Sequence, residues 1–287
     1  LDQAAGPWIV CLDADDECPP ETLAGIRDLK ACSPDRAFGF RIMSTQDGVT
    51  GTVSSQIRMF PKVPGVRFRY RVHEQIRPSL VAAKIPIRFT DLTILHRGYT
   101  DRKTVEEKQR RNLALLEKDL REHPQDPYLH YVAGMAFFDL GMPQDASREL
   151  ETVWQLASKS RDQRHIALGA ALRLAGMSME GAAGRSLLEA GHWLRRAEGL
   201  FPEHPEFLYL KGKFLLGQGD MEGGAKYLQR LLRCGPPDFI LPVDLVMIKS
   251  QGAALLAQAL ISQGRSQEAV SVIEEAQRLL QDRKSAG

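Results

Sequence analysis

Apolar positions follow two different periods along the chain, and the change between them falls near residue 126. Before that point, short apolar runs of strand length are separated by turn residues. They predict strands at 8–12, 38–43, 56–60, 66–76 and 86–95, with helices at 21–32 and 102–122. After that point, apolar residues recur with the 3.6-residue period of amphipathic helices. The pattern therefore predicts an α/β domain followed by an all-α domain.

The run at 8–12 is apolar on both faces, which is typical of a central parallel strand. Asp13 and Asp15 follow it, and at i, i+2 in extended backbone their carboxylates point to the same side. Two such carboxylates repel each other unless a cation lies between them, and oxygen ligands suit Mg²⁺ or Mn²⁺. The alternative is an ordinary acidic turn that caps the next helix.

The segment 66–76 has the clearest strand alternation in the sequence, with apolar residues on one face and arginines and His73 on the other. The alternation puts Glu74 on the apolar face, where a carboxylate is costly without a partner. Three interpretations stay open. Glu74 is a functional residue that burial makes easier to protonate, or a bulge resets the register there, or Glu74 lies past the strand end in solvent.

The helical half contains an internal repeat. A small residue in the second helix of each predicted unit recurs as Ala146, Ala190, Gly224 and Ala269, at steps of 44, 34 and 45 residues. The middle step is that of a tetratricopeptide repeat. The longer steps exceed it by about three helical turns, so we expect helices extended by that length. The repeat predicts a solenoid of helical hairpins over 126–287, preceded by a linker helix in 101–125.

Composition excludes few functions. The 287 residues are 43% hydrophobic and 26% charged, as in soluble globular proteins, and the formal net charge is +2. Acidic residues concentrate in 1–30 and basic residues in 57–111, which suits a metal beside a phosphate-bearing ligand. Nucleic-acid binding is disfavoured because the arginines of 66–76 lack interleaved aromatics on their own face. The four cysteines form no Cys-x-x-Cys pair, which disfavours zinc and favours a reducing cytoplasm, and no apolar run is long enough to span a membrane.

Five segments, in this order, resemble bacterial family 2 glycosyltransferases whose catalytic domain is followed by tetratricopeptide repeats. They are WIVCLDADDE at 8–17, RMF at 58–60, VHEQ at 72–75, ILHRGY at 94–99 and KQRRNL at 108–113. The resemblance implies that residues 1–100 are the C-terminal part of a nucleotide-diphospho-sugar transferase domain of the GT-A-like α/β fold. Chains of that family begin well before the metal motif. We therefore expect a fragment whose strand 8–12 has an edge that is exposed, covered or repacked.

The resemblance also implies residue roles. Asp13 and Asp15 form the Asp-x-Asp motif, in which Asp15 binds a divalent cation (Mg²⁺ or Mn²⁺) on the diphosphate of a sugar nucleotide and Asp13 lies nearer the ribose or sugar. Glu74 is the candidate base that deprotonates the acceptor hydroxyl, and His73 is its competitor. His96 completes the metal ligands or is a structural histidine.

Two arginines complete the implied site. Arg71 or Arg97 holds the diphosphate, or is a solvated surface charge. The function implied for the parent chain is metal-dependent, inverting glycosyl transfer from a nucleotide-sugar donor to an unknown acceptor, with a protein partner bound by the repeats. This chain is expected to be inactive by itself. The alternative is a non-catalytic tetratricopeptide scaffold.

Overall fold

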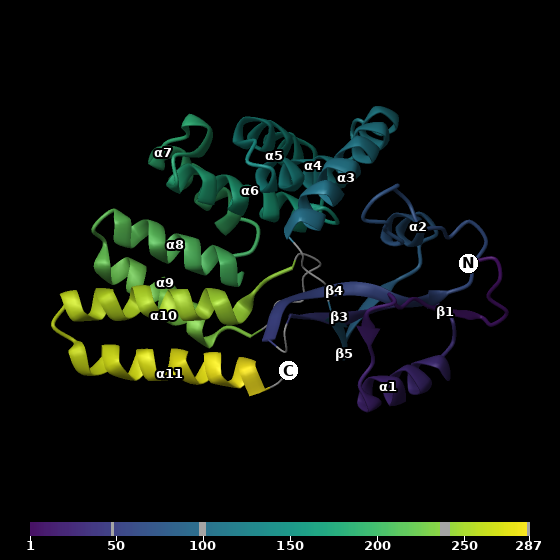
Figure 1. Cartoon of the computed structure of the whole chain (residues 1–287), viewed down its shortest axis with the longest axis horizontal. Coiled ribbons are helices and arrows are strands. Elements are labelled where there is room, and N and C mark those ends of the chain that lie inside the picture. Colours follow the sequence, from purple (N-terminus) through teal and green to yellow (C-terminus); the bar gives the residue numbers. More distant parts are fainter. Residues whose placement is uncertain (47–48, 98–101, 236–241, 286–287) are drawn as a thin grey trace. The chain divides into compact units, whose positions relative to one another are not determined.

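The computed structural model describes residues 1–46, 49–97, 102–235 and 242–285, which form two compact units (Figure 1). The first unit comprises residues 1–102 with Val243, and the second comprises 103–235 with 244–285. A mixed sheet with helices is thus followed by a helical region of tetratricopeptide type, as the sequence predicts.

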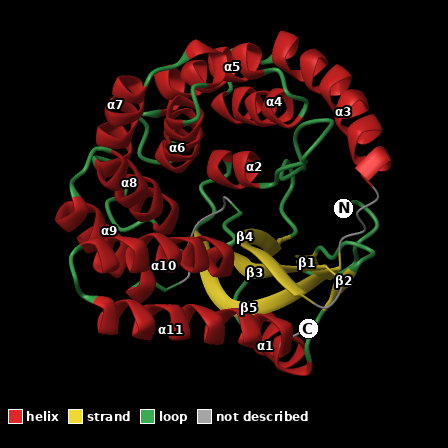
Figure 2. Ribbon diagram, turned by 60° about the vertical axis from the view of Figure 1, so that its left-hand side comes forward, coloured by secondary structure: helices red, strands yellow, loops and turns green. Residues whose placement is uncertain are grey.

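The first unit is built on a five-stranded mixed sheet in the order β1-β4-β3-β5-β2 (Figure 2). Its strands are β1 (Trp8–Val10), β2 (Asp16–Glu17), β3 (Ala37–Gln46), β4 (Val49–Pro61) and β5 (Ile87–Arg97). Strands β3 and β5 run parallel, and the other neighbouring pairs run antiparallel. Val243 adds an antiparallel bridge to Val53 of β4.

Two helices, α1 (Pro20–Lys30) and α2 (Arg77–Ala82), cover opposite faces of this sheet (Figure 1). The strand alternation sends successive side chains to different faces, so Trp8 packs on the α1 face and Ile9 on the α2 face. The α1 cluster consists of Trp8, Phe38, Phe40, Ile42, Met59 and Ile94, and the α2 cluster of Ile9, Ala37, Phe60, Val66, Ile76 and Leu80.

Strand β1 is an edge strand, so its predicted central, parallel position is wrong. It pairs antiparallel with β4, with Trp8 opposite Pro61. Only its first two residues are buried, because Trp8 packs on the α1 face and Ile9 on the α2 face. In the described part of the chain, β1 pairs with β4 alone, and Val10 and Leu12 stay 39% and 48% exposed. This edge is therefore exposed, one of the three outcomes expected from the sequence.

The predicted strand at 66–76 is also wrong, because the segment is an irregular loop between β4 and α2. Its one regular feature is an isolated antiparallel bridge between Arg69 and Gln75. Tyr70 and His73 have positive φ angles of 75° and 52°, which a strand cannot contain.

Burial in this loop follows the alternation only in part. Val66 and Val72 are buried, whereas Phe68 is 40% exposed. The apolar residues anchor a loop on the protein rather than form one face of a strand. Glu74 is exposed, so the structure agrees with the third interpretation, in which Glu74 lies in solvent.

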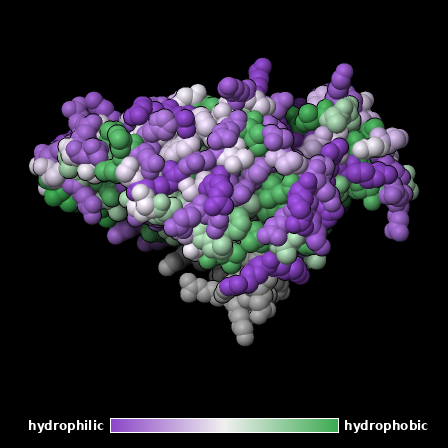
Figure 3. Space-filling view, turned by 90° about the horizontal axis from the view of Figure 1, so that it is seen from above, coloured by the Kyte–Doolittle hydropathy of each residue, from purple (hydrophilic) through white to green (hydrophobic). Residues whose placement is uncertain are grey.

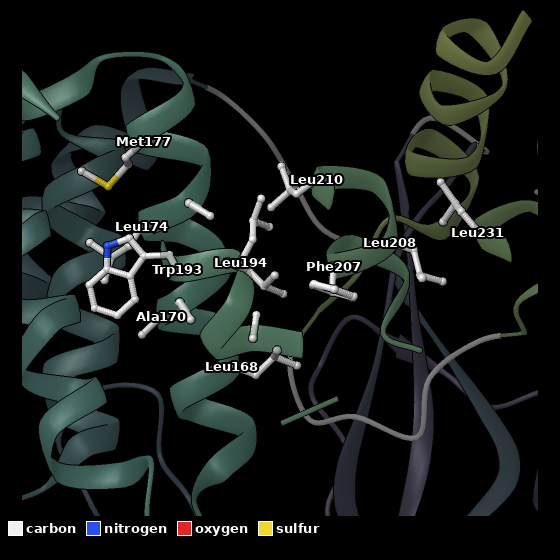
Figure 4. Packing of buried hydrophobic residues seen from close by; sticks show 14 of the residues in the cluster. Leu168, Ala170, Leu174, Met177, Trp193, Leu194, Phe207, Leu208, Leu210 and Leu231 are labelled. Carbon is white, nitrogen blue, oxygen red and sulfur yellow. The ribbon is translucent and has the colours of Figure 1, made fainter. Parts of the chain in front are cut away.

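The second unit consists of α3 and four successive helical hairpins. The helices are α3 (Arg102–Glu122), α4 (Pro127–Asp139), α5 (Pro143–Ala157), α6 (Arg164–Met179), α7 (Leu187–Glu198), α8 (Pro205–Gly217), α9 (Met221–Arg233), α10 (Leu245–Ser262) and α11 (Ser266–Ser285). Apolar side chains of successive helices interlock, as shown for Leu174, Trp193 and Phe207 in Figure 4.

The predicted repeat is confirmed, because Ala146, Ala190, Gly224 and Ala269 are all buried in the second helix of a hairpin. The expected three-turn extension of helices is wrong. Helix α6 has 16 residues against 13 in α4, which is less than one extra turn. Against the 34-residue step, the ten extra residues of the first long step divide into three in α5, three in α6 and four in the connection 180–186, which contains a short 3₁₀ helix.

Contrary to the expectation from the sequence, helix α10 is by length and composition long and apolar enough to cross a membrane, with a mean hydropathy of 1.4 over its 18 residues. A core helix of a soluble protein passes the same test, and 33% of this helix is buried. It packs against α8, α9 and α11, and its buried Leu256 and Leu260 belong to the core of the helical unit. On the face shown in Figure 3, polar side chains interrupt the apolar areas. The apolarity of α10 therefore has a use in packing the repeats.

Candidate metal centre

A tight acidic turn carries the chain from β1 to β2. The amide of Asp16 donates to the carbonyl oxygen of Asp13 over 3.1 Å, and the amide of Asp13 donates to Oδ2 of Asp16 over 2.9 Å. The turn places Asp16 opposite His96 in the antiparallel pair of β2 and β5. An acidic side chain that accepts from the turn backbone stabilises such a turn, and here the turn also fixes the carboxylate.

Asp13, Asp16 and His96 converge where β2 pairs with β5, and their ligand atoms lie within 4.8 Å of one another. Nδ1 of His96 is 3.0 Å from Oδ1 of Asp16 and 3.5 Å from Oδ1 of Asp15. The Asp16 side chain is fully buried, whereas those of Asp13 and His96 are 56% and 29% exposed. The cluster therefore has a fixed inner carboxylate and an outer one that solvent reaches.

Arg58 of β4 brings a positive charge to the same carboxylates. Its Nη2 atom donates to Oδ2 of Asp13 over 2.8 Å and lies 3.1 Å from Oδ2 of Asp16. The Arg58 side chain is only 8% exposed, and its buried Nε has no hydrogen-bond partner among the described residues. The hydrogen bond from Arg58 lowers the pKa of Asp13, so that this carboxyl group is ionised at neutral pH.

The donor set fits a hard or borderline divalent cation such as Mg²⁺ or Mn²⁺, which binds carboxylate oxygens and accepts an imidazole nitrogen. Two carboxylates, those of Asp13 and Asp16, contact the Arg58 guanidinium group, and a third, that of Asp15, lies beside His96. Arg58 thus compensates only part of their negative charge. The remaining negative charge favours binding of a cation.

The structure brings together two of the three predicted metal ligands, Asp13 and His96, and places Asp15 beside His96. Asp16 was missed because the prediction assumed extended backbone after Asp13, whereas the chain turns there. Arg58 was missed although it left a signal, since it is a lone cation inside the apolar run 57–60. The metal-binding role of each residue stays a prediction.

The other predicted site residues lie at the surface. Arg97 pairs with Glu17 at 2.5 Å, and both side chains are more than half exposed. Arg71, His73 and Glu74 lie exposed on the irregular loop. Residues 98–99 of the 94–99 motif lie outside the described residues. The roles predicted for these residues stay predictions as well.

Comparisons with known proteins show a repeat region and a distant relationship. The family model described as "Tetratricopeptide repeat" matches residues 182–239. The SPbeta prophage-derived glycosyltransferase SunS of Bacillus subtilis (strain 168) is 26% identical over 169 residues, 58% of this chain and 40% of that protein. Glycosyltransferase SunS of Bacillus phage SPbeta gives the same values. The matched region thus spans well under half the length of these curated relatives.

Solved structures similar to this chain include MamA from Desulfovibrio magneticus RS-1, with a TM-score of 0.44 and 16% identity. That similarity covers 63% of this chain and 93% of the MamA chain. YrrB, described as a TPR protein with an unusual peptide-binding site, has a TM-score of 0.42 and 14% identity, covering 62% of this chain and 81% of its own.

Proposed function

We propose that the sheet unit is the cation-binding part of a glycosyltransferase that uses a sugar nucleotide, and that the helical repeats bind a partner protein. The observation that carries the first half is the convergence of Asp13, Asp16 and His96 in a chain distantly similar to glycosyltransferase SunS. The match to tetratricopeptide repeats supports the second half, because stacked repeats present extended surfaces for binding.

In this proposal Asp16 positions His96, and the Asp13 carboxylate binds the cation. When His96 donates its Nδ1 proton to Oδ1 of Asp16, 3.0 Å away, its Nε2 atom keeps the lone pair that a cation needs. Asp13 offers its exposed carboxylate to solvent, and Asp15 adds charge beside His96. A divalent cation bound here would neutralise the negative charge that develops on a leaving diphosphate.

The exposed residues supply the rest of the proposed reaction. Glu74, or His73 as its competitor, accepts the proton of the acceptor hydroxyl, and solvent access at both residues admits an acceptor. Arg97 or Arg71 binds the diphosphate. Arg97 must first leave Glu17, which costs little because exposed ion pairs contribute only about 0–1 kcal/mol.

Arg58 favours one alternative, a non-catalytic scaffold. Its guanidinium group already hydrogen-bonds to Asp13 and lies beside Asp16, so it serves as an internal cation for the buried carboxylate. In that case the acidic cluster holds the sheet edge together, and protein binding by the repeats is the whole function. The two possibilities differ in whether the cluster binds a divalent ion.

A titration with Mn²⁺, followed by loss of the electron paramagnetic resonance signal of the free ion, tests the site. We expect one bound ion, and at least tenfold weaker binding by the Asp16→Asn variant. Asp28→Asn is the matched control, because Asp28 is an exposed acid on α1. Equal Mn²⁺ binding by Asp16→Asn and the original chain would remove this cluster from the proposal.

The reaction itself requires a second assay. Release of nucleoside diphosphate by the full-length native protein is measured on a panel of UDP-, GDP- and dTDP-sugars, with Mn²⁺ and with a chelator. The proposal predicts Mn²⁺-dependent release that Asp15→Ala reduces. Mn²⁺ binding without any such release supports a cation site and contradicts the transferase.

A further inference from the structure

A cavity of about 590 Å³ lies between α5 and α7, within the second unit. These are the second helices of the first two hairpins. In Figure 2 they lie on the outer side of the helical unit, whereas α4 and α6 lie on its inner side. The volume is typical of pockets that hold a ligand or a side-chain cluster of a partner. The described acidic cluster of the sheet has no residue in its lining.

The sequence builds one wall of this cavity by helical spacing. On α7, Leu188, His192, Arg195 and Arg196 follow one another at i, i+4, i+7 and i+8, so they share one face. Ser186 caps the helix in a capping box with Glu189 and so fixes where that face begins.

The floor of the cavity is Arg185, whose side chain is only 8% exposed. Its Nε donates to Oγ of Ser147 over 2.8 Å, and its guanidinium group pairs with Glu151. Glu189 lies 3.9 Å from the same group. The two carboxylates and this arginine therefore partly cancel one another's charge and form a rigid, preorganised base.

Trp154 of α5 meets this α7 wall in an aromatic contact, and the same wall carries the positive charges of Arg195 and Arg196. Trp154 and Trp193 meet edge to face with ring centroids 5.9 Å apart, and the Arg196 guanidinium lies 5.2 and 4.6 Å from those centroids. Among the described residues, Arg195 and Arg196 form no ion pair. Burial, with both arginines close by, lowers the pKa of His192, so this histidine is neutral at pH 7.

Two parts of this surface are open to a ligand. Leu188 is 81% exposed at the rim, and Trp154 is only partly buried. Trp193 is 6% exposed, and Figure 4 shows its ring near Leu174 and Ala170 of α6. An apolar contact at Leu188 and Trp154 thus adjoins an anion contact at Arg195.

We propose that the α5–α7 cavity binds a peptide segment of a partner protein that carries an apolar side chain and, a few residues away, a carboxylate. The apolar side chain packs on Leu188 and Trp154, and the carboxylate pairs with Arg195 and Arg196. This inference rests on the proposed protein binding by the repeats and assigns it to their outer side. A nucleobase fits less well, because Arg196 already covers both indole rings.

The test is a selection of random 12-residue peptides displayed on phage against the immobilised chain, followed by binding of the synthetic peptides. We expect selected peptides to carry Asp or Glu within four residues of Leu, Phe or Trp. Arg195→Glu and Leu188→Ser should weaken their binding at least tenfold, and Arg195→Lys should largely retain it. Arg233→Glu is the matched control, because Arg233 is exposed near the end of the second helix of the next hairpin.

Indole ¹⁵N–¹H spectra locate the bound peptide, since the chain has only Trp8, Trp154 and Trp193. The Trp154 signal should shift and the Trp8 signal should stay. Peptides that bind with undiminished affinity to Arg195→Glu, or that leave the Trp154 signal in place, overturn this inference while protein binding by the repeats stands. Failure to select any binding peptide contradicts both the α5–α7 peptide site and protein binding by the repeats.

Discussion

Replacing Arg58 with methionine distinguishes a cation site from a structural salt bridge. Methionine keeps an unbranched apolar stem of similar reach in the buried position and removes the guanidinium group. Asp16, whose side chain is fully buried, then loses the positive charge 3.1 Å from its Oδ2 atom. Asp13 loses the hydrogen bond that lowers its pKa.

The expected loss of stability follows from this geometry. At 3.1 Å and an effective dielectric constant of about 20, the attraction between Arg58 and Asp16 is about 5 kcal/mol before desolvation. Removing one partner of a buried ion pair costs about 3–5 kcal/mol. His96 lies 3.0 Å from the other oxygen of Asp16 and compensates part of this loss. We therefore expect the sheet unit to lose about 3 kcal/mol in the Arg58→Met variant.

Added Mn²⁺ gives opposite results for the two functions. If the cluster is a cation site, the ion takes the place of Arg58, and a concentration 100 times the dissociation constant restores about 2.7 kcal/mol. If Arg58 is only a structural counter-ion, Mn²⁺ restores nothing. Hydrogen exchange of β4 and β5 peptides in increasing urea, with and without Mn²⁺, measures the stability that Arg58→Met loses and the stability that Mn²⁺ restores, on the sheet unit alone.

Arg36→Met is the matched control for this experiment. Arg36 pairs with Asp35 at 2.7 Å, but their side chains are 45% and 56% exposed. Breaking an exposed pair costs at most about 1 kcal/mol. If Arg58→Met loses no more stability than Arg36→Met, the buried network does not hold the sheet edge and the reasoning fails.

Three further predictions concern the rest of the chain. Burial lowers the pKa of His204 from 6.5 to about 4, because the folded protein favours the neutral imidazole. The free energy of unfolding is therefore highest above pH 6.5 and decreases as the pH falls to 4. Urea unfolding at pH 7 and pH 4 should show about 3 kcal/mol of loss in the original chain that is absent from His204→Asn, which keeps a residue suited to the helix N-terminus. Gly224→Ala should lower the melting temperature, because its Cβ would lie 2.6 Å from Leu216, and overpacking costs about 1–3 kcal/mol against about 1 kcal/mol of helix propensity gained. A thiol reagent followed by mass spectrometry should label Cys32 first, since it is the exposed cysteine and burial raises the pKa of the other three.

Period and turn chemistry predicted most elements of the fold, because both are local. The helix expected at 102–122 is α3, and the strand expected at 86–95 overlaps β5. The segment 66–76 failed for a physical reason. Alternation reports which residues are buried, and Val66 and Val72 are buried as loop anchors, but the positive φ angles of Tyr70 and His73 leave no mark in that pattern.

Neighbours in a sheet are long-range information, and this limited what the sequence indicated about the site. Asp13 and His96 were expected to meet because the family resemblance assigns both to one metal site, and their ligand atoms do lie together. Asp16 entered the cluster through a turn and a two-residue strand, β2, that carries too little pattern to predict. Arg58 joined from β4, and nothing local shows which carboxylate faces a lone buried arginine.

The acidic cluster joins the stability of the sheet edge to the proposed chemistry. Strand β2 is short, and the two oxygens of Asp16 tie it both to the turn and β4 and to β5. Arg58 Nη2 already lies within 3.1 Å of one oxygen each of Asp13 and Asp16, so a cation cannot bind between those two atoms unless the guanidinium moves. The move gives up only the Nη2 contacts, because Nε has no hydrogen bond among the described residues. On the proposed function, a diphosphate arriving with its cation provides the anion that the displaced guanidinium then needs. Cation and sugar nucleotide should therefore bind more tightly together than either binds alone, and Arg58→Met should weaken that coupling while it strengthens binding of the cation alone.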